Sequence, residues 1–138
     1  MAQRIEEIMT PNPTTIPASA TLVAAARAMR DHDIGDVVVL EDSKPCGILT
    51  DRDVVVRAVA TGKDPSTTTI AEICSRDVTT VSSKDTVDTA VALMAQKALR
   101  RLPVVDDDLV IGIVTIGDLA GYDVDSAIAD ISAAPPNR

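Results

Sequence analysis

The sequence contains an internal duplication with a period of 65 residues. Residues 5–54 align without a gap on residues 70–119, with 14 identities in 50 positions. The longest shared segment places Gly47-Ile48-Leu49-Thr50-Asp51-Arg52-Asp53 on Gly112-Ile113-Val114-Thr115-Ile116-Gly117-Asp118. A copy of about 65 residues is marginal for an independent hydrophobic core, so we expect the two copies to pack together. Such packing predicts a pseudo-twofold axis and two equivalent clefts between the copies.

Each copy has the pattern strand, helix, strand, strand, helix, which predicts an α/β fold. Apolar residues at helical spacing mark the first helix of each copy: Leu22, Ala25, Ala26 and Met29, then Val87, Ala90, Val91 and Met94. Strands are predicted at Val37–Leu40 and Leu102–Val105, and returning strands at Cys46–Leu49 and Leu109–Val114. We assign repeat 1 to residues 5–66, repeat 2 to residues 70–130 and a frayed tail to residues 131–138.

Two further helices are expected in each copy. The second helix of repeat 1 is predicted to start at Thr50 and to end near Gly62, and its counterpart to start at Thr115. A short helix is expected ahead of each copy, at Gln3–Met9 and at Thr69–Cys74. Thr69 and Glu72 have the spacing of a capping box for the latter.

Composition and charge exclude several classes of partner. The net charge is −8 and Tyr122 is the single aromatic residue, so the chain lacks both the basic surface and the stacking platforms of nucleic-acid binders. No segment approaches the roughly 20 apolar residues of a membrane span, and the N-terminus does not have the pattern of a signal peptide. Cys46 and Cys74 form no metal or redox spacing. We therefore expect a cytoplasmic protein that binds neither nucleic acid nor membrane.

The pattern Thr-x-x-Asp occurs once in each copy, at Thr50/Asp53 and at Thr115/Asp118. Both pairs stand where a strand ends and a helix begins. The start of a helix favours a phosphate group, the Thr hydroxyl can add a donor, and an Asp one turn later can accept hydrogen bonds from a ribose diol. The same spacing is also that of a helix-capping box. The duplication copies caps as faithfully as sites, so the sequence leaves both interpretations open.

Several motifs together resemble the CBS domain, the motif named after cystathionine β-synthase. They are Gly-Ile-x-Thr-x-x-Asp after a strand, Leu102-Pro103-Val104-Val105-Asp106 before it, and the opening Ile8-Met9-Thr10-Pro11. The resemblance covers roughly residues 5–130. Paired copies are similar to a stand-alone tandem CBS module, also called a Bateman module.

The resemblance implies regulatory binding of an adenosyl ligand, such as AMP, ADP, ATP, S-adenosylmethionine or NAD, in the clefts between the copies. By the same resemblance Asp53 and Asp118 would bind the ribose hydroxyls, and Thr50 and Thr115 would bind phosphate. The positions expected to border the adenine are Thr15-Ile16 and Thr80-Val81. For these residues, plain strand packing is the alternative.

The two copies differ in charge beside the Thr-x-x-Asp pairs. Arg100-Arg101 precede the strand of repeat 2, where the family often has basic residues facing phosphate, whereas repeat 1 has Gly35-Asp36. Asp36 should repel a polyphosphate, an effect that Arg52 partly offsets. Repeat 1 also has Val38 where repeat 2 has Pro103, the residue usual in the family. We predict that the repeat 2 site, with Thr115 and Asp118, is the better nucleotide site, although a solvated face is the alternative for the arginines.

No enzyme or metal site is predicted. His32 is the single histidine and lies at a helix end, where a solvated residue is expected. Asp106-Asp107-Asp108 has the pattern of a turn and lacks the Gly and distant Glu of a calcium-binding loop. Cys46 and Cys74 are expected to be small core residues. A Ser-His-Asp or Cys-His arrangement finds no support in the sequence.

The sequence therefore favours a regulatory module that senses an adenosyl ligand and passes the signal to an effector protein. The resemblance also implies a homodimer that forms a flat disk of four copies. The alternative is a dimeric scaffold protein with vestigial clefts, in which the Thr-x-x-Asp pairs only cap helices.

Overall fold

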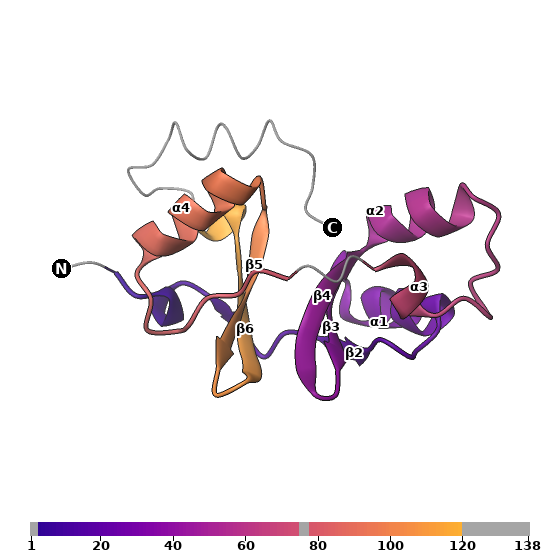
Figure 1. Cartoon of the computed structure of the whole chain (residues 1–138), viewed down its shortest axis with the longest axis horizontal. Helices are drawn as coiled ribbons and strands as arrows, with labels where there is room; N and C mark the ends of the chain where they lie inside the picture. Colours follow the sequence, from indigo (N-terminus) through magenta and orange to yellow (C-terminus); the bar gives the residue numbers. More distant parts are fainter. Residues whose placement is uncertain (1–2, 75–77, 120–138) are drawn as a thin grey trace. The chain divides into compact units, whose positions relative to one another are not determined.

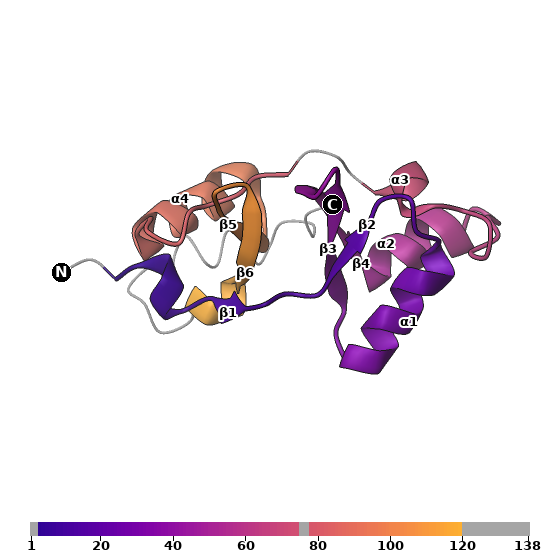
Figure 2. The same cartoon turned by 90° about the horizontal axis from the view of Figure 1, so that it is seen from below.

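A computed structural model describes residues 3–74 and 78–119 of the chain (Figures 1 and 2). The chain divides into two compact units, each with its own hydrophobic core. In the described part, the first unit contains residues 14–74 with residue 78, and the second contains residues 3–13 with residues 79–119. Each unit combines a small sheet with helices, which confirms the predicted α/β fold.

The first unit begins with strand β2 (Thr15–Pro17), helix α1 (Leu22–His32) and strands β3 (Asp36–Glu41) and β4 (Lys44–Thr50). It continues through the short helix α2 (Asp51–Asp53), the π-helical segment η2 (Val54–Val59) and helix α3 (Ile70–Ile73). The sheet order is β2-β3-β4, with β2 parallel and β4 antiparallel to the central β3. Both strands of the predicted hairpin are thus present, each extended by one to three residues.

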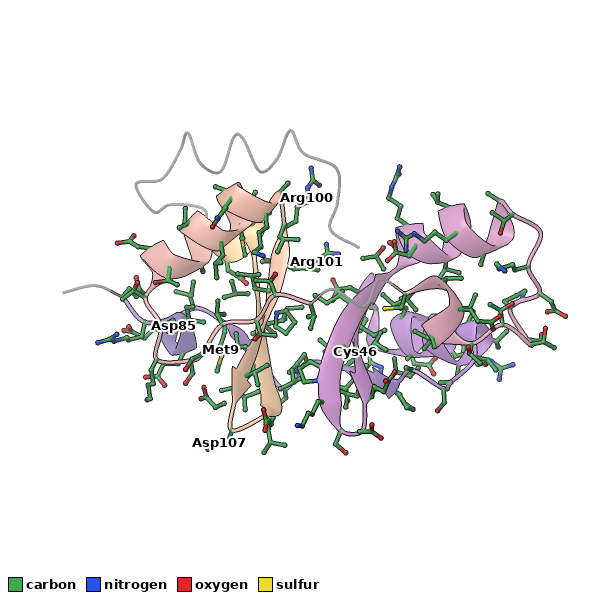
Figure 3. The ribbon with its side chains drawn as sticks, viewed as in Figure 1. Met9, Cys46, Asp85, Arg100, Arg101 and Asp107 are labelled. Carbon is green, nitrogen blue, oxygen red and sulfur yellow. The ribbon has the colours of Figure 1, made fainter. Side chains whose placement is uncertain are left out.

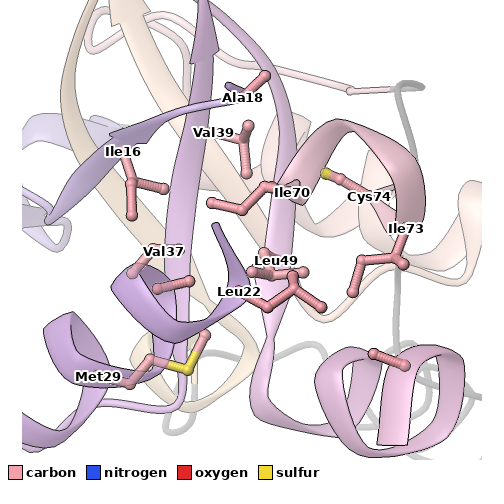
Figure 4. Packing of buried hydrophobic residues seen from close by; sticks show 12 residues of the cluster. Ile16, Ala18, Leu22, Met29, Val37, Val39, Leu49, Ile70, Ile73 and Cys74 are labelled. Carbon is pink, nitrogen blue, oxygen red and sulfur yellow. The ribbon is translucent and has the colours of Figure 1, made fainter. Parts of the chain in front are cut away.

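The core of the first unit lies between this sheet and the helices (Figure 4). Strand β3 contributes Val37 and Val39, and β4 contributes Leu49. Leu22, Ala25 and Met29 of α1 pack onto them, as the helical spacing predicts. Cys74 is buried in the same cluster and Cys46 packs against it, in agreement with their prediction as small core residues.

The second unit repeats this arrangement with a different chain order. It contains η1 (Ile5–Glu7), β1 (Thr10–Pro11), α4 (Val87–Lys97), β5 (Arg101–Asp106), β6 (Leu109–Thr115) and η3 (Ile116–Leu119). The sheet order is β1-β6-β5, and all its paired strands are antiparallel. The strand predicted near Thr80 and Val81 is reduced to a single parallel bridge between Val81 and Val104.

The compact units are offset from the sequence repeats because the leading segments pack elsewhere. Ile5, at the start of repeat 1, is fully buried in the core of the second unit, where its N–H donates to Asp85 O at 2.9 Å. Ile70, the equivalent residue of repeat 2, is fully buried in the core of the first unit. The compact units therefore differ from the sequence repeats in the leading segments that they contain. The predicted tail, 131–138, lies outside the described residues.

Local capping explains where the two long helices start. Thr21 and Thr86 precede α1 and α4, and each side chain accepts a hydrogen bond from the backbone N–H three residues later. Ahead of α3, Glu72 accepts from the N–H of Thr69 at 2.6 Å, so this predicted capping interaction is confirmed.

The predicted second helices differ from expectation in their pitch. In repeat 1 the helix starts after Thr50, but from Val54 it widens into a π-helix, an uncommon form that often accompanies functional sites. Gly62 follows with φ +79°, consistent with its predicted role at the helix end. In repeat 2, the described part of the helix is a 3₁₀ turn at Ile116–Leu119. Within residues 3–74 and 78–119, no helix is long and apolar enough to cross a membrane.

Candidate functional site

Each hairpin has two faces, and one of them carries the predicted site. Because successive side chains of a strand point to opposite faces, the residues between the core positions share the other face. We call this the threonine face. It is formed in the first unit by Asp36, Val38, Ile48 and Thr50, and in the second by Arg101, Pro103, Ile113 and Thr115. The structure thus brings Thr50 next to Asp36, and Thr115 next to Arg101.

In the first unit, Thr50 and Asp53 form a reciprocal capping box. The Thr50 Oγ1 accepts from the Asp53 N–H at 3.0 Å, and Asp53 Oδ2 accepts from the Thr50 N–H at 3.0 Å. Thr50 is 4% exposed and Asp53 is 5% exposed. A charged carboxylate at this depth requires hydrogen-bond donors, which the start of the helix supplies. The capping box that the spacing predicted is therefore present at this pair.

The second unit repeats the box with a more accessible geometry. Asp118 Oδ2 accepts from the Thr115 N–H at 2.8 Å, and Thr115 Oγ1 accepts from the Asp118 N–H at 3.3 Å. Both side chains are half-buried. Within the described residues, the other carboxylate oxygen of Asp118, Oδ1, accepts no hydrogen bond. A carboxylate has about four acceptor positions, so the cap leaves Asp118 able to accept a further donor such as a ribose hydroxyl.

The residue opposite the threonine decides the charge of each site. Strand register pairs Asp36 with Thr50 and Arg101 with Thr115. The neighbouring residues are Gly35 and Arg100, and their carbonyl oxygens accept from Asp51 N–H at 2.9 Å and from Ile116 N–H at 2.8 Å. Figure 3 shows Arg100 and Arg101 at the start of β5. The predicted difference in charge therefore lies at the strand positions paired with the two threonines and at their neighbours.

The remaining predicted residues divide between surface and core. Ile16 and Val81 belong to the hydrophobic cores, and Val81 also bonds to β5 through both its N–H and its carbonyl oxygen. Strand packing, the alternative considered for this group, therefore describes these two side chains. Thr15 and Thr80 are exposed, as is Arg52, one residue before Asp53.

A polar cluster in the second unit was not predicted. Asp106 accepts hydrogen bonds from the Ser82 hydroxyl at 3.0 Å, the Ser83 N–H at 3.1 Å and the Ser83 hydroxyl. The Ser83 hydroxyl, followed by its N–H, holds the pKa of Asp106 below its ordinary value. The sequence offered a sign of this cluster, because Ser82-Ser83 stand where repeat 1 has Pro17-Ala18.

The residues that follow Asp106 form the hairpin turn. Asp107 and Asp108 have positive φ, as expected for a tight hairpin turn.

The sequence predicts neither a metal site nor a catalytic histidine. Among the described residues, no group of three or more His, Cys, Asp or Glu side chains could hold a metal ion. His32 is exposed at the end of α1, where its Nδ1 lies 3.0 Å from the carbonyl oxygen of Ala28. This position agrees with the predicted surface residue at a helix end.

Comparison with known proteins identifies the duplicated unit. A family model for the CBS domain matches residues 5–59 and again residues 70–125. The uncharacterized protein MK0525 of Methanopyrus kandleri is 43% identical over 115 residues, which cover 82% of this chain and 56% of that protein. The chain therefore spans little more than half of that relative. The CBS domain-containing protein YhcV of Bacillus subtilis is 36% identical over 116 residues, with coverage of 84% and 82%.

Solved structures show the same fold. Hypoxic Response Protein I, crystallised with two coordinated zinc ions, is 34% identical with a TM-score of 0.76, covering 86% of this chain and 97% of that one. The CBS domain pair of MJ0100, in complex with 5′-methylthioadenosine and S-adenosylmethionine, is 30% identical with a TM-score of 0.76, covering 87% and 94%. A hexameric CBS-CP12 protein from bloom-forming cyanobacteria is 30% identical with a TM-score of 0.78, covering 91% and 75%.

Proposed function

Since the chain belongs to the CBS-domain family and carries two copies of the domain, we propose that it is a regulatory module that senses an adenosyl ligand. CBS pairs are regulatory modules, and a solved relative binds 5′-methylthioadenosine and S-adenosylmethionine. The observation that carries the proposal is the Thr115–Asp118 box. It stands on the threonine face, opposite Arg101, with one carboxylate oxygen of Asp118 not used by the cap.

In this proposal each polar group of the second unit has a defined role. Asp118 binds the ribose hydroxyls through Oδ1 while Oδ2 holds the helix cap. Thr115, Arg100 and Arg101 bind phosphate oxygens, because guanidinium groups suit that geometry. With no Trp or Phe in the chain, aliphatic residues such as Pro103 contact the base. Thr15 and Thr80 border the adenine, and Thr50, Asp53 and Arg52 form the corresponding, weaker site of the first unit.

The signal would pass to another protein. A ligand changes the equilibrium between two conformations only by its difference in affinity for them. We propose that this chain acts as a cytoplasmic homodimer and that the population shift changes its affinity for an effector protein. No obligatory cofactor and no catalytic step are part of the proposal.

The test is a thermal-shift panel on the full chain with AMP, ADP, ATP, S-adenosylmethionine and NAD. Saturation at a hundredfold excess over the dissociation constant adds about 2.7 kcal/mol to the free energy of unfolding. For a chain of this size the melting temperature then rises by several degrees. The shift should disappear in Asp118→Ala. Thr86→Ala is the matched control, because it removes a helix cap at α4, costs about 1 kcal/mol, and leaves the threonine face unchanged.

A scaffold protein with vestigial sites is the second candidate. Four exposed apolar residues of the first unit favour it: Ile34, Val55, Val56 and Val59. Exposed apolar surface of this kind is typical of protein interfaces. In that case Asp118→Ala and Thr86→Ala lose similar stability, and no adenosyl compound changes the melting temperature of any variant. This outcome would exclude the ligand-sensing proposal.

A further inference from the structure

We infer that the two repeats bind adenosine ligands of opposite charge: the second takes a 5′-phosphate, and the first takes a 5′ substituent that is neutral or cationic. The inference rests on the proposed function, because it assigns a ligand class to each of the two sites. It depends on the charged residues that surround the two capping boxes.

The two sites share the same backbone framework. In the first repeat, the N–H of Asp51, which follows the threonine, donates to the carbonyl oxygen of Gly35 at 2.9 Å. In the second repeat, the N–H of Ile116 donates in the same way to the carbonyl oxygen of Arg100 at 2.8 Å. In each repeat the threonine is paired with the residue that follows this carbonyl group, Asp36 or Arg101. Side chains at equivalent positions therefore stand at equivalent places relative to the capping box.

Charges at these equivalent places are reversed. Within the Thr-x-x-Asp segment and the start of its paired strand, the first repeat has three carboxylates, from Asp36, Asp51 and Asp53, and one guanidinium, from Arg52. Over the same positions, all within the described residues, the second repeat has one carboxylate, from Asp118, and two guanidinium groups, from Arg100 and Arg101. Gly117 and Ile116 replace Arg52 and Asp51, so no further charge is added there. Arg30 and Asp33 of the α1 end also line a pocket with Asp51.

The loop of the first repeat also fixes one of these acids close to the strand. A Cβ atom added to Gly35 would lie 3.2 Å from Asp51 Oδ2, so the carboxylate lies directly against the position that Arg100 has in the second repeat. Asp51 Oδ1 in turn accepts from the N–H of Arg52 at 2.8 Å. The position that Arg100 occupies in the second repeat is therefore next to the carboxylate of Asp51 in the first repeat.

This arrangement makes the two repeats differ in the 5′ substituent that they favour, while the residue types proposed to bind the sugar are the same in both. Both repeats keep a Thr and an Asp at the positions proposed for the sugar, and the pair of the first repeat is the more deeply buried of the two. A phosphate at the first site would be repelled by the carboxylates of Asp36 and Asp51. An amine, a sulfonium or an uncharged thioether avoids that repulsion, and a cation gains from it.

The experiment is calorimetric titration of the full chain with three adenosines that differ at the 5′ position. AMP carries an anion, 5′-methylthioadenosine is neutral and 5′-amino-5′-deoxyadenosine is a cation at pH 7. We expect one equivalent of AMP per chain. Asp36→Arg, which copies the second repeat, should raise this to two. Arg101→Asp should weaken AMP binding by about tenfold or more and leave binding of the amino compound to the first repeat unchanged.

The control variant is Asp88→Arg, which alters the net charge by the same amount at an exposed position in the first turn of α4. It should leave all three titrations unchanged. The inference is wrong if the native chain binds two equivalents of AMP, if Asp36→Arg does not add a second, or if AMP binds while neither of the other compounds does. In each of these cases the proposed function survives. If none of the three adenosines binds, the proposed function fails as well.

Discussion

The two units, built from one duplicated sequence, differ in how the segment before the long helix is connected to the hairpin turn. In the second unit, Ser82 and Ser83 bond to Asp106, and Lys84 bonds to Glu6 at 2.9 Å. In the first unit, small or apolar residues replace the two serines and Lys84, while Glu41 takes the place of Asp106. A pocket of about 370 Å³ is present there, lined by Pro17, Ala18, Ser19, Leu40, Glu41, Asp42 and Ala71. The duplication has kept the apolar cores and the helix caps, while the polar connections around them have diverged.

The largest expected effect tests what the units share. Ile5→Ala should lower the free energy of unfolding by about 2–5 kcal/mol, because it leaves a cavity in a fully packed core. Ile70→Ala should cost a similar amount in the first unit. Urea denaturation gives the totals, and amide hydrogen exchange shows where protection is lost.

The location of the lost protection tests whether the leading segment of each repeat packs into the unit that contains the other repeat. Ile5→Ala should reduce protection in α4, β5 and β6, although Ile5 belongs to repeat 1. Ile70→Ala should reduce protection in α1, β3 and β4. If each variant instead weakens the unit formed by its own repeat, the assignment of the leading segments is wrong.

A smaller effect tests the polar cluster that only the second unit has. Removing the hydroxyl in Ser83→Ala should raise the pKa of Asp106 toward its ordinary value, which a carbon-detected NMR titration of the carboxyl group measures. The native chain should also be more stable than the variant at neutral pH. Because the folded-state pKa of Asp106 is lowered, this advantage is complete above the unfolded-state pKa and is lost as the pH falls through the folded value.

The control for this pH dependence is Ser19→Ala, a change of the same kind beside the pocket of the first unit. It should alter neither the pKa of Asp106 nor the acid limb of the stability curve. The carboxyl groups of Asp31 and Glu72 also have lowered pKa values, but they are common to all these variants. Equal acid limbs for the native chain and Ser83→Ala would show that the hydroxyl does not hold the charge of Asp106.

The smallest expected effect concerns the ends of α1 and α4. Both end in a residue with left-handed backbone angles, Asp33 with φ 55° and Ala98 with φ 55°. Alanine is strained there, whereas Asp visits this region more readily. Ala98→Gly should therefore stabilise the chain by about 0.5–1 kcal/mol, and Asp33→Gly by less. Chemical denaturation measures both, and an equal gain or a loss for Ala98→Gly would contradict this explanation.

Sequence reasoning predicted the features that depend on local pattern. The two long helices α1 and α4, both hairpins and the Thr69–Glu72 cap followed from spacing and repetition, and the fold family followed from the resemblance of the motifs to the CBS domain. The opposite charges of Asp36 and Arg101 also followed, because alignment of the two copies places them at one position. The structure adds that register puts each of them directly across from its threonine.

Features that depend on long-range packing could not be predicted. The burial of Ile5 in the second unit joins residues separated by about 80 positions in the chain, and no local pattern indicates such a contact. The π-helix at Val54–Val59 also escaped prediction, because the apolar pattern of this segment does not distinguish a π-helix from an α-helix. The cap and the ligand interpretations of Asp118 seemed exclusive from spacing alone. The geometry removes that conflict, because the cap uses only one carboxylate oxygen.

The most direct test of the central claim is an NMR titration of the full, isotope-labelled chain with AMP. If the second repeat is the phosphate-binding site, the amide signals of Arg101, Thr115 and Asp118 should move in a saturable way, and those of Asp36, Thr50 and Asp53 should move far less. Saturable binding that leaves Arg101, Thr115 and Asp118 unmoved, or no binding at all, would contradict the claim.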